Sequence, residues 1–252
     1  MIMEKGKKWL SVLSILIVVA VWQILSFFVP PLFLPGPITV VVESYNLYHN
    51  ILWASISTTI FRVIAGFFLG SVIGIFVAIL MSWNKDLLAF CEPIVEILRP
   101  VPVLALIPLF ILWFGLGETG KILLIATGSF VILVVNTREA IRNVKPVYIQ
   151  AARTLGASKK KQIFRTIILR AITPEIIGGI RVAAAASFGL AAAAEFLGAQ
   201  QGIGYIIIQA RRFLYTHGVI FGILLFSLLS WVADTIIRKI DARINRWTQR
   251  FT

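Results

Sequence analysis

The chain has 252 residues, of which 59% are hydrophobic and only 14% are charged, and its mean hydropathy is +0.92. Soluble domains carry about 25% charged residues, so this composition excludes an ordinary soluble protein and predicts a membrane protein. The single cysteine excludes an internal disulfide framework, and two distant histidines give no metal-binding pattern, so no metal or redox chemistry is expected.

Six apolar segments are long enough to cross a hydrocarbon core of about 30 Å as helices. They comprise residues 9–29, 59–82, 89–114, 121–137, 174–199 and 217–237. Runs of this length favour helices over the short alternating strands of a membrane barrel. We therefore predict an all-α polytopic membrane protein, with six transmembrane helices in one domain over residues 1–252. The first segment has no small-residue cleavage site and is too long for a signal peptide, so we expect it in the mature chain.

The net charge of +13 is unevenly distributed. With a cytoplasmic N-terminus, the outer segments contain only Lys121, Arg211 and Arg212. The cytoplasmic segments contain most of the 24 basic residues: Lys5, Lys7, Lys8, Lys85, Arg138, Arg142, Lys145, Arg153, Lys159, Lys160, Lys161, Arg165, Arg170, Arg238, Lys239, Arg243, Arg246 and Arg250. This positive-inside bias explains the basicity without a nucleic-acid partner, and it predicts that both termini are cytoplasmic.

The segment between the first two spans, residues 30–57, begins with PPLFLPGP and contains no Lys or Arg. We expect it to be an outer loop, with Trp53 as an interfacial anchor. The second span then places small residues at every fourth position: Gly66, Gly70, Gly74 and Ala78. Such spacing lets helix backbones approach closely in lipid, so it predicts packing against another helix; lining of a pathway is the alternative.

The third span is interrupted by proline. RPVPVLALIP, Arg99–Pro108, contains three prolines and disfavours a straight helix. Non-helical backbone at membrane depth is tolerated where it is buried in protein or lines a cavity. The alternatives are a translocation pathway and a kinked packing element whose charges, Glu92, Glu96 and Arg99, pair locally.

The residues between the fourth and fifth spans, 138–173, hold nine Lys or Arg and one acid, Glu139, so this segment is not a span. We expect one short helix that ends at Gly156, a suitable C-cap residue. Its compact face is expected to comprise Ala151, Ala152, Leu155 and Gly156. A second short helix with apolar residues in Ile163–Ile168 is expected to end at Pro174, where the next span begins. Such a projecting cytoplasmic segment, residues 143–173, can enter a groove on another protein.

The pattern Gln150-Ala151-Ala152, followed by Gly156 and later by Pro174, resembles the EAAxxxG motif of the membrane subunits of ABC importers. PIVEILRPVPVLALIPLFILWFGLGETGKILL (residues 93–124) and AAEFLGAQQGIGYII (residues 193–207) resemble the aliphatic sulfonate, taurine and nitrate branch. The resemblance covers nearly all of the chain from residue 34 to residue 252. It departs at Gln150, where the family has Glu, and at Arg170, near a frequent first proline. An ion pair at position 150 is therefore in question.

The resemblance implies a type I ABC importer permease fold and a coupling helix that sits in a cleft of a cytoplasmic ATPase. On this chain it assigns the ATPase contact to Gln150, Ala151, Ala152, Arg153, Leu155, Gly156 and Ala157. It implies as partners two copies of an ABC ATPase, a second copy of this permease and an extracytoplasmic solute-binding protein. The location is then a bacterial or archaeal plasma (inner) membrane. A basic loop held against anionic headgroups is the alternative for the segment.

ATP and Mg are expected on the ATPase, because this chain has no GxxxxGK[ST] loop and is expected to hold no cofactor. The implied activity is ATP-driven import of a small anion of the sulfonate, taurine or nitrate type by alternating access. Related importers carry thiamine-precursor pyrimidines or riboflavin-type molecules. A molecule of this kind is therefore the alternative substrate for this chain. The competing classes are an ATP-independent carrier or channel, which needs an ion relay, and a membrane scaffold, which needs no broken third span.

Ionisable residues inside a membrane are functional candidates, because their insertion costs about 3 kcal/mol each. Arg62 and Glu195 lie just inside the outer ends of their spans, and they either neutralise each other or flank a cavity, with Arg62 attracting an anionic substrate that Glu195 orients. The pathway candidates are Arg62, Glu96, Arg99 and Glu195, with Glu92 and Arg181 also near the inner face. Catalysis is not expected, because Glu118 lies in a predicted outer loop without an evident acidic partner.

Overall fold

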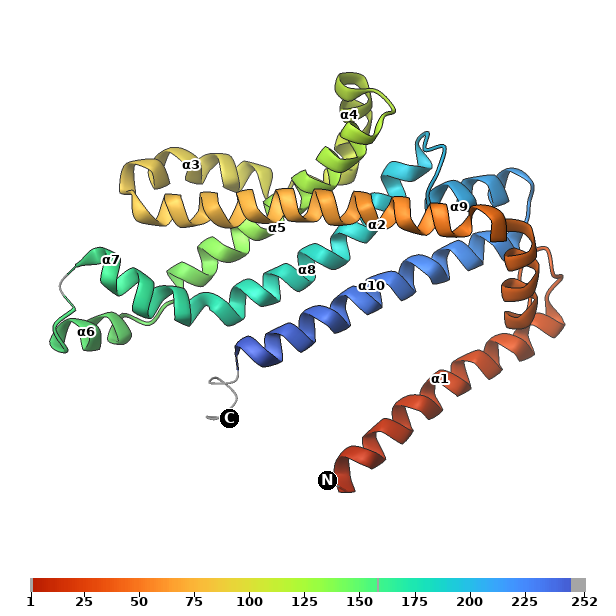
Figure 1. Ribbon diagram of the computed structural model, residues 1–252, viewed down its shortest axis with the longest axis horizontal. Helices are drawn as coiled ribbons and strands as arrows, with labels where there is room; N and C mark the ends of the chain where they lie inside the picture. Colours follow the sequence, from red (N-terminus) through yellow and green to blue (C-terminus); the bar gives the residue numbers. More distant parts are fainter. Residues whose placement is uncertain (1, 158, 246–252) are drawn as a thin grey trace. The chain divides into compact units, whose positions relative to one another are not determined.

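The computed structural model describes residues 2–157 and 159–245, except for the side chains of residues 2–8 and 11. Every regular element in these residues is a helix (Figure 1), so the all-α class is confirmed. The chain divides into two compact units: the residues up to Thr58 with Gln200–Ser227, and Thr59–Ala199 with the residues from Leu228. The terminal basic residues of the predicted cytoplasmic ends lie outside the described side chains: Lys5, Lys7, Lys8, Arg246 and Arg250.

The first unit contains α1 (Ile2–Phe28), the first part of α2 (Pro37–Trp83), α9 (Ile203–Arg212) and the start of α10 (Thr216–Ile244). Its buried core joins α2, α9 and α10 through Val40, Tyr48, Leu52, Ile206, Ala210 and Phe221. Trp22 of α1 donates its indole N–H to the Pro35 carbonyl at 3.1 Å. This bond attaches α1 to the proline-rich connection that follows it.

The predicted outer loop at residues 30–57 is wrong in part, because α2 already begins at Pro37. Proline suits the first turn of a helix, where its missing N–H has no intrahelical partner. Val40, Tyr48 and Leu52 recur at multiples of four residues and are buried on one face. That spacing was the available helix signal, and the prolines before it obscured it. Trp53, the expected interfacial anchor, is 77% exposed.

The second unit contains the remainder of α2 and α10 and all the helices of residues 85–196. These are α3 (Lys85–Leu98), the 3₁₀ turn η1 (Val103–Leu106), α4 (Ile107–Phe114), α5 (Glu118–Arg142), α6 (Pro146–Thr154), α7 (Lys160–Ile163), the π-helical turn η2 (Phe164–Ile168) and α8 (Leu169–Phe196). The helices α5 and α8 pack together, with a hydrogen bond of 2.9 Å between the buried hydroxyls of Ser129 and Ser187. They form the centre of this unit.

The small residues of α2 pack against α5, as their spacing predicts. A Cβ at Gly66 would lie 2.6 Å from Cβ of Ile125, and one at Gly74 would lie 2.8 Å from the Phe130 carbonyl oxygen. A Cβ at Gly70 would lie nearer still to the carbonyl oxygen of Ala126. Only glycine permits this approach of the two backbones, and the packing function of the stripe is confirmed.

The predicted break in the third span is present. The helix α3 and the segment Val103–Phe114 meet at 87°, and Arg99–Pro102 lie between them. By length and composition, four helices of the described residues can cross a membrane, and this bent pair can be a fifth. The apolar part of α1, Val12–Phe28, is shorter. The predicted count of six spans is therefore not confirmed.

The second short cytoplasmic helix is not a separate element. The helix continues from Lys160 through η2 into α8 and ends at Phe196, with Pro174 in its interior. Proline leaves a carbonyl of the preceding turn without its usual N–H. The Thr173 hydroxyl donates to the Leu169 carbonyl at 2.7 Å in the same turn. The prediction that the helix stops at Pro174 was wrong, because helices of membrane proteins tolerate such prolines.

Candidate functional site

The helix α6 contains most of the EAA-like residues and has a defined beginning and end. Lys145 is extended, and Pro146 occupies the first turn. At the other end, Gly156 has φ +93°, its N–H donates to the Arg153 carbonyl at 3.0 Å, and the Ala157 N–H donates to the Ala152 carbonyl at 2.9 Å. This pair of bonds is a Schellman motif, which requires the left-handed conformation that glycine adopts without strain. Gly156 therefore ends α6, as predicted.

The predicted compact face of α6 is divided between two sides of the helix. Ala152 is buried with Ala157 against Ile163, the last residue of α7. Leu155 is 88% exposed and Ala151 is also exposed. Gln150 and Arg153 are exposed beside them. The helix thus uses one alanine to attach to α7 and presents the other to the surroundings.

The outward side of α6 is an apolar stripe that the sequence analysis described only in part. Val147 is 57% exposed and Tyr148 is 50% exposed. Together with Ala151 and Leu155 they recur at intervals of three and four residues, so all four lie on one helical face. We call Val147, Tyr148, Ala151 and Leu155 the α6 stripe. The signals that could have identified the first two members are the four-residue spacing Val147, Ala151, Leu155 and the three-residue spacing of Tyr148 from Ala151.

The segment that follows α6 is attached to the end of α2. The rings of Trp83 and Phe164 meet edge to face with centroids 5.1 Å apart. The Lys160 ammonium lies 5.4 Å from the centroid of the Trp83 ring and donates to the Trp83 carbonyl. A cation over an indole face is stabilising. These contacts fix α7 on the second unit, and α7 in turn supports α6.

The charges of the broken third span pair with α5 rather than with one another. Arg138 bonds Glu92, and its Nη1 lies 3.3 Å from Glu96 Oε1. Arg99 lies 3.3 Å from Glu139, and the Arg99 side chain is 54% exposed. Of the two alternatives for this span, local pairing of its charges is therefore wrong. The sequence did not show these pairs, because residues 40 or more positions apart meet only once α3 packs along α5.

An open groove of about 410 Å³ lies directly at this break. It is lined by Arg99, by the residues of the kink, and by one face each of α5 and α8. The lining residues are Arg99, Val101, Pro102, Val103, Leu104, Gly128, Val131, Ile132, Ala186, Gly189 and Leu190. Small-molecule sites occupy about 300–1,000 Å³, so the groove has the size of a ligand site.

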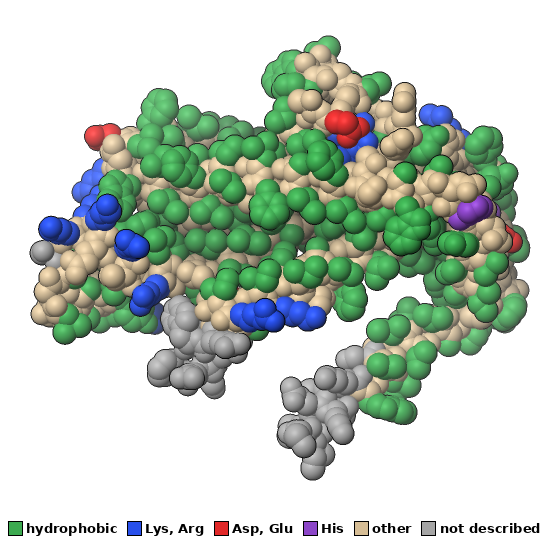
Figure 2. Space-filling model, in the orientation of Figure 1, with side chains coloured by type: hydrophobic (Ala, Val, Ile, Leu, Met, Phe, Trp, Pro, Cys, Tyr) green, Lys and Arg blue, Asp and Glu red, His purple; other side chains and the backbone are tan. Residues whose placement is uncertain are grey.

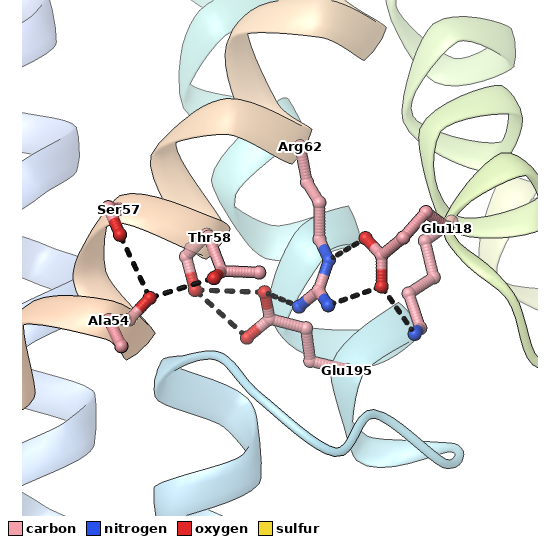
Figure 3. A network of polar contacts seen from close by, with 8 residues as sticks. Ala54, Ser57, Thr58, Arg62, Glu118 and Glu195 are labelled. Carbon is pink, nitrogen blue, oxygen red and sulfur yellow. Dashed lines mark hydrogen bonds and ion pairs between the residues drawn. The ribbon is translucent and has the colours of Figure 1, made fainter. Parts of the chain in front are cut away.

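The other two pathway candidates, Arg62 and Glu195, form a buried ion pair (Figure 3). Arg62 Nη1 lies 2.7 Å from Glu195 Oε1, and the side chains are 2% and 0% exposed. Thr59 donates to the same carboxylate at 2.8 Å. A buried charge that keeps a hydrogen-bonded partner avoids the large cost of isolation. The pairing expected from the sequence is therefore present in the structure.

Glu118 belongs to the same group: it begins a helix rather than lying in the predicted loop, and it is paired with the cations Arg62 and Lys121 rather than with a second acid. It is the first residue of α5, and it receives two hydrogen bonds from Arg62, at 2.5 Å from Nε and at 2.6 Å from Nη2. Lys121 lies 3.2 Å from Glu118 and is itself buried. The side chain of Glu118 is 51% exposed. Two cations and two carboxylates therefore meet where α2, α5 and α8 approach each other.

Arg181, also considered near the inner face, is paired as well. Its Nε donates to Asp234 at 2.8 Å, and Arg238 approaches the other oxygen of that carboxylate at 2.9 Å. Within the described residues, no group of three or more His, Cys, Asp or Glu has the arrangement of a metal site. Most of these charged residues therefore join helices, and of the four pathway candidates Arg99 also lines the groove at the break.

The exterior of the second unit separates apolar from basic side chains. Figure 2 shows hydrophobic side chains over the exposed face of α2 and Lys and Arg side chains at the end with α6 and α7. Phe61, Phe68 and Phe76 on α2 are each about 60% exposed. Large apolar side chains at such exposure suit contact with lipid. The fold and its surface thus define a multi-pass helical membrane protein with a polar, helical segment outside the apolar helices.

The chain belongs to the family of binding-protein-dependent transport system inner membrane components, which matches residues 70–246. It is 34% identical to a putative aliphatic sulfonates transport permease protein of Bacillus subtilis, over 93% of this chain and 86% of the relative. It is 30% identical to the taurine transport system permease protein of Escherichia coli, over 94% and 89% of the two chains. It is therefore the permease subunit of an ABC importer, which works with a separate ATPase and a binding protein.

A solved structure of the MetNI methionine ABC transporter in inward-facing conformations shares the fold. The TM-score is 0.60 at 22% identity, covering 75% of this chain and 96% of that chain. The expected type I importer permease architecture is thereby confirmed.

Proposed function

We propose that this permease imports a small anion of the sulfonate, taurine or nitrate type, with two copies of the chain enclosing the pathway between them. The named cargo of the Bacillus and Escherichia relatives supports this substrate class. Two ATPase subunits and an extracytoplasmic binding protein complete the importer. Both termini and α6 lie in the cytoplasm in this arrangement, in keeping with the basic residues beside α6.

The observation that carries the proposal is the geometry of α6. A helix of nine residues, closed by a Schellman motif and attached through Ala152 to α7, presents an apolar stripe on its free side. Short amphipathic helices bind in grooves through side chains spaced three and four residues apart. The α6 stripe is therefore the surface that enters the ATPase, with Gln150, Arg153, Gly156 and Ala157 beside it.

In the proposed cycle, ATP binding closes the ATPase pair and displaces the two docked α6 helices. Because α6 packs on α7, and α7 continues into α8, the displacement reaches the helix that lines the groove at the break. The permease then changes from inward-facing to outward-facing by rigid-body movement between two packings. Hydrolysis returns it to the first state.

The pathway candidates have different tasks in this proposal. Arg99 belongs to the pathway because it lines the groove at the break, and Glu96 holds Arg138 and so keeps α3 against α5. Arg62 and Glu195 hold α2 and α8 together, because Arg62 is almost fully enclosed and its donors are engaged by carboxylates. Contact of Arg62 with an anionic substrate remains the competing interpretation.

Copurification tests the docking surface. The tagged chain is isolated from its native membrane in mild detergent, and the proteins that accompany it are identified by mass spectrometry. We expect an ABC ATPase with the natural sequence and at least tenfold less of it with Leu155→Asp, because a carboxylate cannot enter an apolar groove unpaired. Gly156→Trp is expected to have the same effect by steric exclusion.

Asn143→Asp is the matched control, since it adds the same charge at an exposed position of the segment outside α6. It is expected to retain the ATPase. If no ATPase accompanies the natural chain while its oligomer stays intact, the docking function of α6 is refuted. If Leu155→Asp and Asn143→Asp lose the ATPase equally, the docking surface lies elsewhere in the segment.

A further inference from the structure

The groove at the break of the third span has one charged residue and mostly apolar walls. Arg99, which is half-exposed and has one nitrogen 3.3 Å from Glu139, lines it, and the other lining side chains are aliphatic or absent. Arginine presents several N–H donors in a planar fork that matches the oxygens of a sulfonate or carboxylate. The walls formed by Val103, Val131 and Ile132 can receive only an apolar group without leaving polar atoms unpaired.

The depth of the groove depends on a glycine of α8. A Cβ built at Gly189 meets no other atom within 4 Å, and Gly189 is exposed. Gly128 across the groove behaves differently, because the Leu190 side chain already packs against it. Open space is therefore left at Gly189, and any larger side chain there would enter the volume available to a ligand.

We infer that this groove is the permease's own substrate subsite, and that it selects an organic anion with a short apolar body, such as an alkanesulfonate. This inference rests on the proposed import of small anions and names the group within that class. Arg99 binds the anionic head, the aliphatic walls cover the body, and Gly189 sets the space for its length. An inorganic anion such as nitrate has no apolar group to pack against the aliphatic walls, so it would bind more weakly.

A second charge on the ligand is also disfavoured. Among the described residues that line the groove, none carries a carboxylate. Glu139 approaches Arg99, and Glu92 and Glu96 approach Arg138, so all three are engaged in the α3–α5 contact. An ammonium group at the far end of the ligand would lie against apolar walls. The groove therefore favours a simple alkanesulfonate over a zwitterionic one.

Thiol labelling of the full-length chain tests the inference without ATP or any partner. Cys91 is replaced by alanine, and a single cysteine is placed in the groove by Gly189→Cys. The reagents are 2-sulfonatoethyl methanethiosulfonate, which is anionic and resembles the inferred ligand, and its trimethylammonium counterpart. Gly178→Cys is the matched control, because Gly178 also lies on α8 with open space around it but does not line the groove.

We expect the anionic reagent to be preferred at position 189 about tenfold more than at position 178, since Arg99 attracts one reagent and repels the other. Arg99→Gln is expected to remove most of this preference, and Arg99→Lys to retain part of it. Butanesulfonate is expected to slow the labelling at position 189. Sodium nitrate at the same ionic strength is expected to leave the labelling rate unchanged. If Gly189→Cys does not fold, Ala186→Cys supplies a second thiol in the same groove.

Three results would overturn the inference. Equal reagent preference at positions 189 and 178 would show that Arg99 does not govern the groove. Equal protection by nitrate and butanesulfonate would remove the need for an apolar body. Inertness to both reagents with disulfide cross-linking at position 189 would mean that a second copy of the chain fills the groove. None of these results touches ATPase docking at α6, so the two proposals fail separately.

Discussion

The contact between α2 and α5 and the short helix α6 both depend on glycine, for opposite reasons. Gly70 lies where the backbone of the neighbouring helix leaves no room for a Cβ, whereas a Cβ at Gly156 would meet nothing within 4 Å. Gly156 is needed because its φ is +93°. The first glycine permits close packing inside the unit and the second directs the chain at the surface. The α2–α5 contact therefore contributes to stability, while Gly156 shapes the end of α6, the helix that we propose docks on the ATPase.

The largest expected effect comes from Arg62→Ala, about one helical turn before Gly66 on α2. It leaves Glu195 buried without its cation, and breaking a buried ion pair costs about 3–5 kcal/mol. We expect loss of most assembled protein from the membrane, measured by size exclusion in detergent. Arg62→Met combined with Glu195→Leu is expected to recover much of it, because an apolar pair needs no counter-ion. Normal assembly with weakened transport of an anion would instead favour substrate contact by Arg62.

Gly70→Ala is expected to have the next largest effect. The added methyl group meets the Ala126 carbonyl, and overpacking of this kind costs about 1–3 kcal/mol. The measurement is the temperature at which the solubilised chain leaves its monodisperse peak, which should fall by several degrees. Gly178→Ala, in open space on α8, is the control and should leave that temperature unchanged or raise it. A stable Gly70→Ala would mean that α2 and α5 can separate at little cost.

Gly156→Ala should have a smaller and local effect. A left-handed conformation costs a residue with a Cβ about 1 kcal/mol or more, so α6 should open about fivefold more often. Hydrogen–deuterium exchange of the α6 amides measures this, and the amides of α5 should not change. Gly117→Ala is the control, since Gly117 has φ −70° and open space around it. Unchanged exchange in α6 would show that the Schellman motif does not hold its end.

Leu155→Asp should change stability least. Leu155 is 88% exposed, and substitutions at such surface positions usually stay within about 0.5 kcal/mol. The thermal transition of the isolated permease should therefore match that of the natural chain, even though ATPase binding is lost. A clear loss of stability would place Leu155 in a contact within the permease and would break the distinction between α6 and the α2–α5 contact.

The parts of this structure that follow from local spacing could be predicted from the sequence. The glycines at intervals of four, the prolines after Arg99 and the glycine that ends α6 each have a short-range physical cause. The partners of the charged residues could not be predicted, because Glu118 meets Arg62, and Arg138 meets Glu92, only after distant helices have packed. The predicted loop at residues 30–57 was wrong from Pro37 onward, because proline is common both in loops and in the first turn of a helix, and here it begins α2.

The continuous helix from Lys160 to Phe196 has a mechanical consequence. Its 37 residues run about 55 Å from the support of α6 to the residue beside Glu195, and the π-helical turn η2 and Pro174, where a helix bends most easily, both lie in the half nearer α6. If one end is held, a tilt of only about 5° moves the other end sideways by about 5 Å, which is about half the distance between packed helices. Under the proposed docking, a small movement at α6 is therefore enough to shift side chains at the opposite end, as long as the helix does not bend at η2 or at Pro174.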